Sequence, residues 1–128
     1  MFKKKIALAL GLAMLAGSST AWAGGQSAYP LVIDSATNRI MGSLGSVRNS
    51  ANSLESLDIV IQAGNGFTVA VIFAQDSTAA VAICNTSNKD MIEVLKAATS
   101  DAFIDVTHDG LGTCTHVEVR NASFLEPK

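Results

Sequence analysis

Two runs of strand-forming residues on either side of a glycine-bearing turn are the clearest hydrophobic pattern in this 128-residue chain. They span residues 57–63 and 67–73, and the connection between them is Gly64-Asn65-Gly66. A three-residue connection with glycine between two such runs predicts a β-hairpin. Both runs are apolar at successive positions, which is typical of strands covered on both faces. We therefore expect this hairpin at the centre of the fold.

The rest of the chain contains shorter strand-like runs and one helical segment. We predict further strands at residues 31–34, 38–47, 78–84, 102–108 and 113–120, and a loop rich in Asn and Ser at residues 48–56. In residues 89–99 the apolar positions change to a helical period, and Ser87 or Asn88 can cap this helix. The side chains that we expect in the core are Ile59, Ile61, Val69, Val71, Ile83, Leu95 and Val117.

The order of these elements favours a small β barrel. Three strands, a short helix and a closing hairpin follow one another, which is the order of the five-stranded oligosaccharide/oligonucleotide-binding (OB) barrel. Gly42 and Gly45 interrupt the first long strand pattern, as expected for a bulge or a sharp bend. We therefore predict a mainly β domain with one helix, built as an OB-like barrel. An α+β sandwich is the alternative.

The first 23 residues have the three parts of a secretory signal peptide in order. Three lysines follow the first two residues, residues 6–16 are apolar, and a small-x-small cleavage site ends at Ala23. A short membrane anchor is the alternative, but the apolar run is too short to span a bilayer comfortably. We expect cleavage after Ala23, which leaves residues 24–128 as a single OB-like domain in the periplasm or outside a bacterial cell.

Removal of this leader changes the charge of the chain. The leader contains three of the nine Lys and Arg residues and none of the eleven Asp and Glu residues, so residues 24–128 have a net charge of −5. Binding to a phosphate backbone depends on clustered Lys and Arg, so we expect no nucleic-acid partner and no membrane partner after cleavage. Apolar residues make up 48% of the chain and charged residues 16%, which excludes a disordered tail.

The chain has two cysteines, Cys84 and Cys114. In an oxidising compartment, a lone pair of cysteines usually forms a bridge. Cys84 ends the predicted strand before the helix, and Cys114 lies near the start of the last strand. These two strands can approach each other in a closed barrel, so we predict one disulfide bond between Cys84 and Cys114.

The stretch from Ala82 to Val106 resembles the centre of the pentameric B subunits of bacterial AB5 toxins. In both, a strand leads through a polar turn into a helix with an apolar stripe and then into another strand. Small periplasmic OB-like proteins show a similar likeness. The resemblance implies an OB-type fold. The sialic-acid-binding toxin subunits have several exposed aromatic residues and a different cysteine placement, so no binding residue is transferred to this chain.

One polar pair is a candidate for chemistry. Pairing residue 108 with residue 113 in the last hairpin places Asp105 directly opposite His116, and a carboxylate beside an imidazole can act as a general base. No serine or cysteine nucleophile is placed beside this pair, so we interpret it as a surface pair. In this register His108 lies on the other face of the sheet, so it cannot share a metal ion with His116. We predict no catalytic residue, no cofactor and no metal site.

These features favour a secreted or periplasmic binding module that is not an enzyme. Its ligand is a protein or a glycan, and the low aromatic content favours a protein, because sugar sites use exposed aromatic side chains. One alternative is a secreted inhibitor or immunity-type protein that inserts residues 48–56 into a partner. Another is a small hydrolytic enzyme that uses Asp105 and His116. A homo-oligomer is left open.

Overall fold

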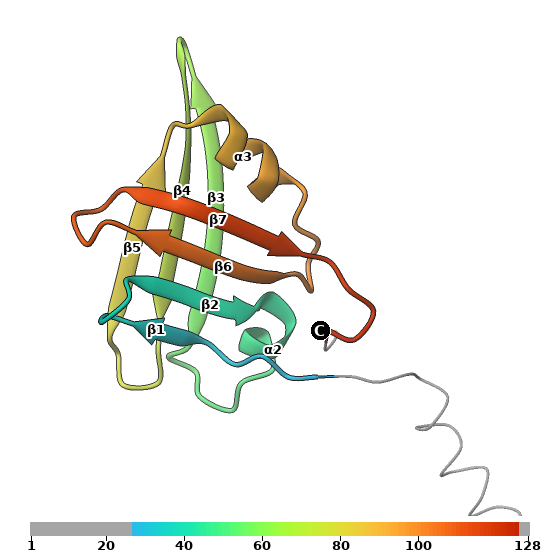
Figure 1. Ribbon diagram of the computed structural model, residues 1–128. Coiled ribbons are helices and arrows are strands. Elements are labelled where there is room, and N and C mark those ends of the chain that lie inside the picture. The colour runs from blue at the N-terminus through green and yellow to red at the C-terminus, as the bar shows by residue number, and fades with distance from the viewer. Residues whose placement is uncertain (1–26, 126–128) are drawn as a thin grey trace, which may run out of the picture.

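Two antiparallel sheets and two helices make up residues 27–125, the part of the chain that the computed structural model describes (Figure 1). One sheet contains, in spatial order, β1 (Val32–Asp34), β2 (Arg39–Ser43), β6 (Phe103–His108) and β7 (Cys114–Arg120). The other contains β3 (Ser56–Gly64), β4 (Phe67–Gln75) and β5 (Val81–Thr86), and the helices are α2 (Leu44–Arg48) and α3 (Lys89–Lys96). The predicted β-rich fold is confirmed. The predicted signal peptide, residues 1–23, lies outside the described residues.

The predicted hairpin is confirmed as β3 and β4, which pair along all nine residues of each strand. Gly66 has a φ of +80°, a left-handed conformation that glycine adopts without strain at the hairpin tip. The expectation that both faces of the hairpin are covered is wrong. Ala70 and Ile72 on the inner face of β4 are fully buried, whereas the alternate residues are only half-buried. The reason is that the second sheet covers one face of this sheet only (Figure 1).

The core lies between the inward faces of the two sheets, and α3 packs at one end of it against β7, β3 and β4. The largest fully buried apolar side chains are Ile40, Ile72, Leu95, Ile104 and Val106. Leu95 and Val117 are therefore buried as predicted. The remaining five side chains expected in the core are half-buried or exposed.

Ile59, Val69 and Val71 are half-buried, and the assignments of Ile61 and Ile83 to the core are wrong. Ile83 is 52% exposed, because it precedes the buried Cys84 in β5 and successive side chains of a strand point to opposite faces. Ile61 is 37% exposed although it pairs with the buried Ala70, because β3 is an edge strand of its sheet. The apolar pattern alone does not say which of two faces is covered.

A capped turn replaces the start of the strand predicted at residue 78. The Asp76 Oδ1 atom accepts hydrogen bonds from the backbone N–H groups of Thr78 and Ala80, at 2.9 and 3.0 Å. Ala79 adopts a φ of 67°, which is uncommon for a residue with a side chain outside turns. β5 therefore begins at Val81, three residues later than the pattern predicts.

Helix α3 begins as predicted and ends before Thr99. The Asn88 Oδ1 atom accepts a hydrogen bond from the Met91 N–H at 3.0 Å, which caps the first turn. At the other end, the Asn121 side chain donates to the Ala97 carbonyl at 2.9 Å and accepts from the Thr99 N–H at 3.1 Å. These bonds turn the chain away from the helix axis. Neither described helix is long and apolar enough to cross a membrane.

A short helix also replaces the second half of the strand predicted at residues 38–47. Ser43 ends β2, and its hydroxyl accepts a hydrogen bond from the Ser46 N–H at 3.2 Å, which makes it the N-cap of α2. The Ser46 hydroxyl in turn accepts from the Tyr29 N–H at 2.9 Å. The predicted bulge or bend is therefore a change from strand to helix.

The two sheets do not close into one barrel. On one side, β5 and β7 are joined by the predicted disulfide bond between Cys84 and Cys114, whose Cα atoms are 5.1 Å apart. A hydrogen bond of 2.9 Å from the Asn85 N–H to the Gly112 carbonyl lies beside it. On the other side, β3 pairs with β4 alone among the described strands. We call the β5–β7 side the closed seam and the free edge of β3 the open seam.

The two ends of the described chain are in contact. The Ser27 N–H donates to the Phe124 carbonyl at 2.6 Å. The ring of Tyr29 lies 6.1 Å from that of Phe124 and 5.3 Å from that of Phe103, measured between centroids. Hydrogen bonding and ring packing thus hold both ends beside the four-stranded sheet, where β2 ends and β6 begins (Figure 1).

Candidate functional site

The predicted polar pair, Asp105 and His116, lies on the outer face of the four-stranded sheet. The register of β6 and β7 places Asp105 opposite Glu118 and His116 opposite Thr107, so the predicted direct pairing of Asp105 with His116 is wrong. The turn is one residue longer than predicted, and the ladder shifts by a further residue between Thr107 and His108. Asp105 and His116 are diagonal neighbours on one face.

Arg39 from β2 binds the carboxylate of Asp105. The Arg39 Nε atom donates to Asp105 Oδ1 at 3.2 Å, and the Nη2 atom donates to Oδ2. The hydrogen bonds and the negative charge of Asp105 raise the pKa of Arg39 above its usual value. Because both carboxylate oxygens bind Arg39, and no hydrogen bond joins Asp105 to His116 in the described structure, this pair does not have the geometry of a general base.

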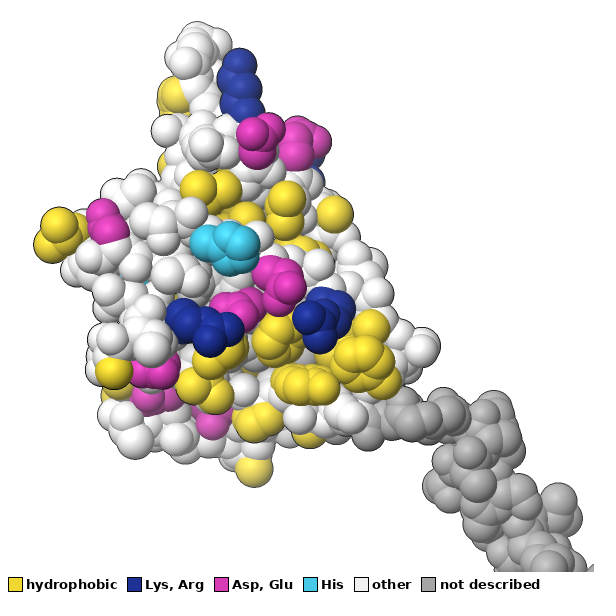
Figure 2. Space-filling model, viewed as in Figure 1, with side chains coloured by type: hydrophobic (Ala, Val, Ile, Leu, Met, Phe, Trp, Pro, Cys, Tyr) yellow, Lys and Arg dark blue, Asp and Glu magenta, His cyan; other side chains and the backbone are white. Residues whose placement is uncertain are grey.

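Arg39 and Asp105 belong to a band of charges across this face of the sheet (Figure 2). Glu118 forms an ion pair of 3.6 Å with Arg120, and the guanidinium of Arg120 lies 5.8 Å from the ring centroid of Phe103. Figure 2 shows the acidic side chains gathered between two basic ones, with a histidine beside them. Opposite charges are paired along the band, and the side chains of Arg39, Glu118 and Arg120 are exposed, so this face of the sheet is solvated.

The side chains of the β6–β7 turn are also engaged in local bonds. The His108 Nδ1 atom accepts a hydrogen bond from the Gly110 N–H at 3.1 Å. Asp109 accepts from the N–H groups of Thr113 and Leu111, at 3.0 and 2.7 Å, and these bonds lower the pKa of Asp109 below its usual value. Within residues 27–125, no group of three or more His, Cys, Asp or Glu side chains could hold a metal ion.

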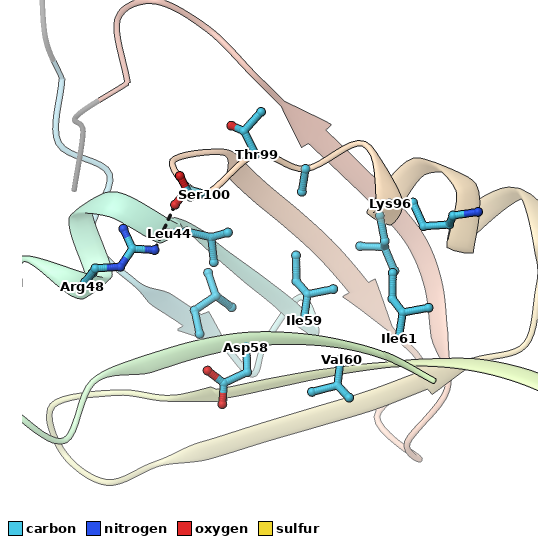
Figure 3. Close-up of a pocket in the computed structure, with 12 residues that line it drawn as sticks. Leu44, Arg48, Asp58, Ile59, Val60, Ile61, Lys96, Thr99 and Ser100 are labelled. Atoms are coloured by element: carbon cyan, nitrogen blue, oxygen red, sulfur yellow. Dashed lines mark hydrogen bonds between the residues drawn. The ribbon is translucent and has the colours of Figure 1, made fainter. Parts of the chain in front are cut away.

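A groove of about 700 Å³ follows the open seam. β3 forms one wall, and α2, the end of α3 and the segment after α3 form the other (Figure 3). The apolar residues that line it are Leu44, Leu57, Ile59, Val60, Ile61, Leu95 and Ala98. Figure 3 shows Ile59 and Ile61 pointing toward the opposite wall, whereas Asp58 and Val60 point away from it. The core side of β3 therefore contributes apolar side chains to a groove whose lining also contains polar groups such as Thr99 and Ser100.

A cationic side chain lies at each end of this groove (Figure 3). The Arg48 Nη2 atom donates to the Ser100 carbonyl at 3.0 Å, and Nη1 lies 3.6 Å from Asp101 Oδ1. These contacts tie α2 to the segment before β6. At the other end, the Lys96 ammonium donates to the Glu93 carboxylate at 2.9 Å. Both cations are exposed, so a ligand in the groove can approach each of them.

β3 presents its backbone as well as its side chains to the groove. In an antiparallel pair, every second residue directs its N–H and C=O groups away from the partner strand. β3 has β4 on one side only, and along residues 57–61 no backbone bond joins it to any other described segment. An unpaired strand edge of this kind is a template for the addition of another strand.

The predicted inhibitory segment, residues 48–56, is held by its own polar groups. The Asn52 N–H donates to the Ser50 hydroxyl at 3.1 Å, and the Asn52 Oδ1 atom accepts from the Leu54 N–H at 2.8 Å. Leu54 is exposed. The segment is thus a capped connection between α2 and β3 with one large exposed apolar side chain, and its insertion into a partner stays a prediction.

Sequence reasoning did not identify the groove, because its lining comes from segments that are far apart in the chain. A signal for it exists in composition. Residues 48–56 and 97–101 are rich in small polar side chains, which are poor strand formers, so neither segment is suited to pair with the second edge of β3. That combination indicates an opening in the β structure where these two segments meet β3.

Comparisons of the chain with protein-family models, with curated proteins and with solved structures found no match. The resemblance to toxin B subunits therefore stays a prediction.

Proposed function

We propose that this chain is an exported, non-catalytic binding module that captures an extended segment of another protein along the open seam. The observation that carries the proposal is the free edge of β3 beside a groove of about 700 Å³ that is lined by both apolar and polar side chains. A segment added to such an edge gains main-chain hydrogen bonds, and its alternate side chains enter the groove.

The groove defines the chemistry of the segment that it takes. Residues 57–61 of β3 line it, so it accommodates roughly five residues of an extended chain at about 3.4 Å per residue. Every second side chain of the ligand meets apolar groups such as Leu44 and Leu95. Arg48 and Lys96 favour acidic groups at the two ends of the bound segment, since complementary charges at a rim guide orientation.

The aromatic side chains favour a protein ligand over a glycan. Phe67 is the one exposed aromatic side chain among the described residues. Tyr29 packs against Phe103 and Phe124, so these rings hold the two ends of the described chain together. A sugar-binding surface needs accessible ring faces for apolar contact.

The arrangement of elements supports an opened form of the OB-like barrel. Strands β3 to β5, helix α3 and the β6–β7 hairpin follow the predicted order. β2 pairs with β6 and β3 pairs with β4, so β2 and β3 share the pairings that one long bent strand would make. The disulfide between Cys84 and Cys114 supports export to the periplasm or beyond, because such bonds persist in oxidising compartments.

Selection of peptides tests this proposal. Displayed random decapeptides are selected on disulfide-bonded protein of residues 24–128, and the selected peptides are synthesised and their affinities are measured. We expect apolar residues at alternate positions, and chemical-shift changes in the amides of residues 57–61. Ala98→Phe fills the groove and should weaken binding at least about tenfold, since a ligand side chain loses its site. Ala97→Phe is the matched control, because Ala97 is exposed and outside the groove.

Two results would contradict the proposal. In one, selected peptides bind Ala98→Phe and the unmodified protein equally well. In the other, the shift changes lie on the outer face of the four-stranded sheet and leave β3 unaffected.

A further inference from the structure

We propose that the outer face of the β3–β4–β5 sheet packs against the same face of a second copy of this chain. The register places seven apolar side chains on this face: Val60, Phe67, Val69, Val71, Phe73, Val81 and Ile83. Asp58 is its one charged side chain. The outer face of the other sheet, by contrast, carries the paired band of charges.

Much of this apolar face is open to solvent. Val60, Val81 and Ile83 are 46%, 55% and 52% exposed. They lie on the two edge strands, and the half-buried Val69, Val71 and Phe73 lie between them on β4, so the patch crosses all three strands. A contiguous apolar patch on an exported domain marks an interaction surface.

The size of the face is sufficient for a weak dimer. Strands of nine residues extend about 30 Å, and three strands span about 14 Å, so each copy offers roughly 400 Å² of sheet. Side chains roughen this surface, and two copies together bury roughly 1,000 Å², which is at the lower limit of specific interfaces. We therefore expect a dimer with a dissociation constant in the micromolar range.

The side chains are complementary under one two-fold arrangement. Val60, Val71 and Asn85 form a row across the three strands. A two-fold axis along this row places Val60 and Val71 against their own copies. It also places Phe73, one row away, against Val69 of the second copy, so that a large side chain meets a small one.

The single charge selects this arrangement. The same axis places Asp58 opposite Gln62 of the second copy, whose amide can donate a hydrogen bond to the carboxylate. An axis along the strands instead would place Asp58 against the apolar Ile83, which removes water from a carboxylate without replacing its hydrogen bonds. A second copy thus supplies the donor that Asp58 lacks, since no described residue bonds to its carboxylate.

The dimer leaves the open seam accessible. Ile59 and Ile61 point into the groove on the opposite side of β3 from Val60 (Figure 3). A chain that does not dimerise could therefore still bind an extended segment in the groove, and a chain that binds no segment could still dimerise.

Sedimentation equilibrium of disulfide-bonded residues 24–128, from about 1 to about 500 µM, tests the proposal, and we expect a reversible dimer. Val60→Lys should weaken it at least about tenfold, because each copy then brings an unpaired ammonium into the interface. Val32→Lys is the matched control, since Val32 is 44% exposed on the outer face of the other sheet and should leave the dimer unchanged.

Two substitutions of Gln62, an exposed residue, test the arrangement and do not depend on Val60→Lys folding normally. Gln62→Lys should tighten the dimer through Asp58, and Gln62→Glu should loosen it. A chain that is monomeric at the highest concentration would overturn the proposal. So would a dimer that Val32→Lys weakens and Val60→Lys does not, or one that shifts in the same direction with both Gln62 variants.

Discussion

The two seams between the sheets are built in opposite ways. At the closed seam, Cys84 and Cys114 join β5 to β7 covalently, and a backbone hydrogen bond lies next to them. At the open seam, β3 meets no strand, and Leu44, Leu95 and Ala98 face it across a groove. Two sheets that are joined to each other on one side do not need a continuous ladder on the other. The fold can therefore keep an unpaired strand edge available for a partner.

Removal of the disulfide bond at the closed seam should have the largest effect on stability. Replacing both cysteines, Cys84→Ala with Cys114→Ala, should lower the free energy of unfolding by about 3–4 kcal/mol, because a bridge between residues 30 apart no longer restricts the unfolded chain. Urea denaturation of the variant and the oxidised parent measures the difference. A loss of less than about 1 kcal/mol would mean that noncovalent packing alone holds the closed seam.

Leu95 tests the packing behind the open seam. It is 2% exposed, and Leu95→Ala should cost about 2–3 kcal/mol of unfolding free energy. This lies toward the lower part of the usual range, because the space left behind opens into the groove and water can enter it. Denaturant titration gives the value, and Val94→Ala, at an exposed position in the same helix, is the control. Equal effects of the two changes would show that the helix face is assigned incorrectly.

The charged band lies on the outer face and supports neither seam, so its removal should have a small effect. In a double-mutant cycle of Arg39→Met and Asp105→Asn, we expect a coupling energy of about 1 kcal/mol or less, since Arg39 is 41% exposed and solvent screens the pair. Thermal unfolding of the four proteins at two salt concentrations measures it. A coupling well above this range, and insensitive to salt, would make the band a structural element equal to the closed seam.

Two turns, one before β5 and one between β6 and β7, give the smallest expected effect, which is a dependence of stability on pH. Hydrogen bonds from Thr78 lower the pKa of Asp76, and backbone hydrogen bonds from Thr113 and Leu111 lower that of Asp109, below the usual 3.8. As the pH falls below 3.8, the unfolded chain binds protons before the folded one does, so stability is complete above this value and decreases below it.

Asp109→Asn should therefore reduce the slope of unfolding free energy against pH between about pH 4 and pH 2.5. Asp58→Asn is the control, because Asp58 makes no hydrogen bond or ion pair within the described chain. Urea midpoints measured at several pH values decide the matter. An unchanged slope for Asp109→Asn would mean that its turn bonds persist in the unfolded chain.

Periodicity predicted the strands and the helix but not how the sheets associate. The hairpin, the cap at Asn88 and the disulfide could be predicted because each depends on local sequence or on a lone pair of cysteines. The exposure of Ile83 could not be predicted, because the sequence of an apolar strand is the same whether a second layer covers one of its faces or both. The pairing of Asp105 with Arg39 also could not, because β2 and β6 are joined only in the folded sheet.

The contact between the two ends of the described chain has a consequence for its connectivity. Ser27 and Leu125 form a bridge with parallel strand direction, and the adjoining aromatic rings hold both ends at one place. A short polar linker would span these two ends. The order of the elements along the chain could then be changed without changing their arrangement in space. A circular permutant that begins at Leu111, which is 90% exposed in the β6–β7 turn, should keep both sheets and the Cys84–Cys114 bond. Its new ends would lie beside the closed seam. A protein fused to either new end would therefore lie away from the hairpin tip and the groove.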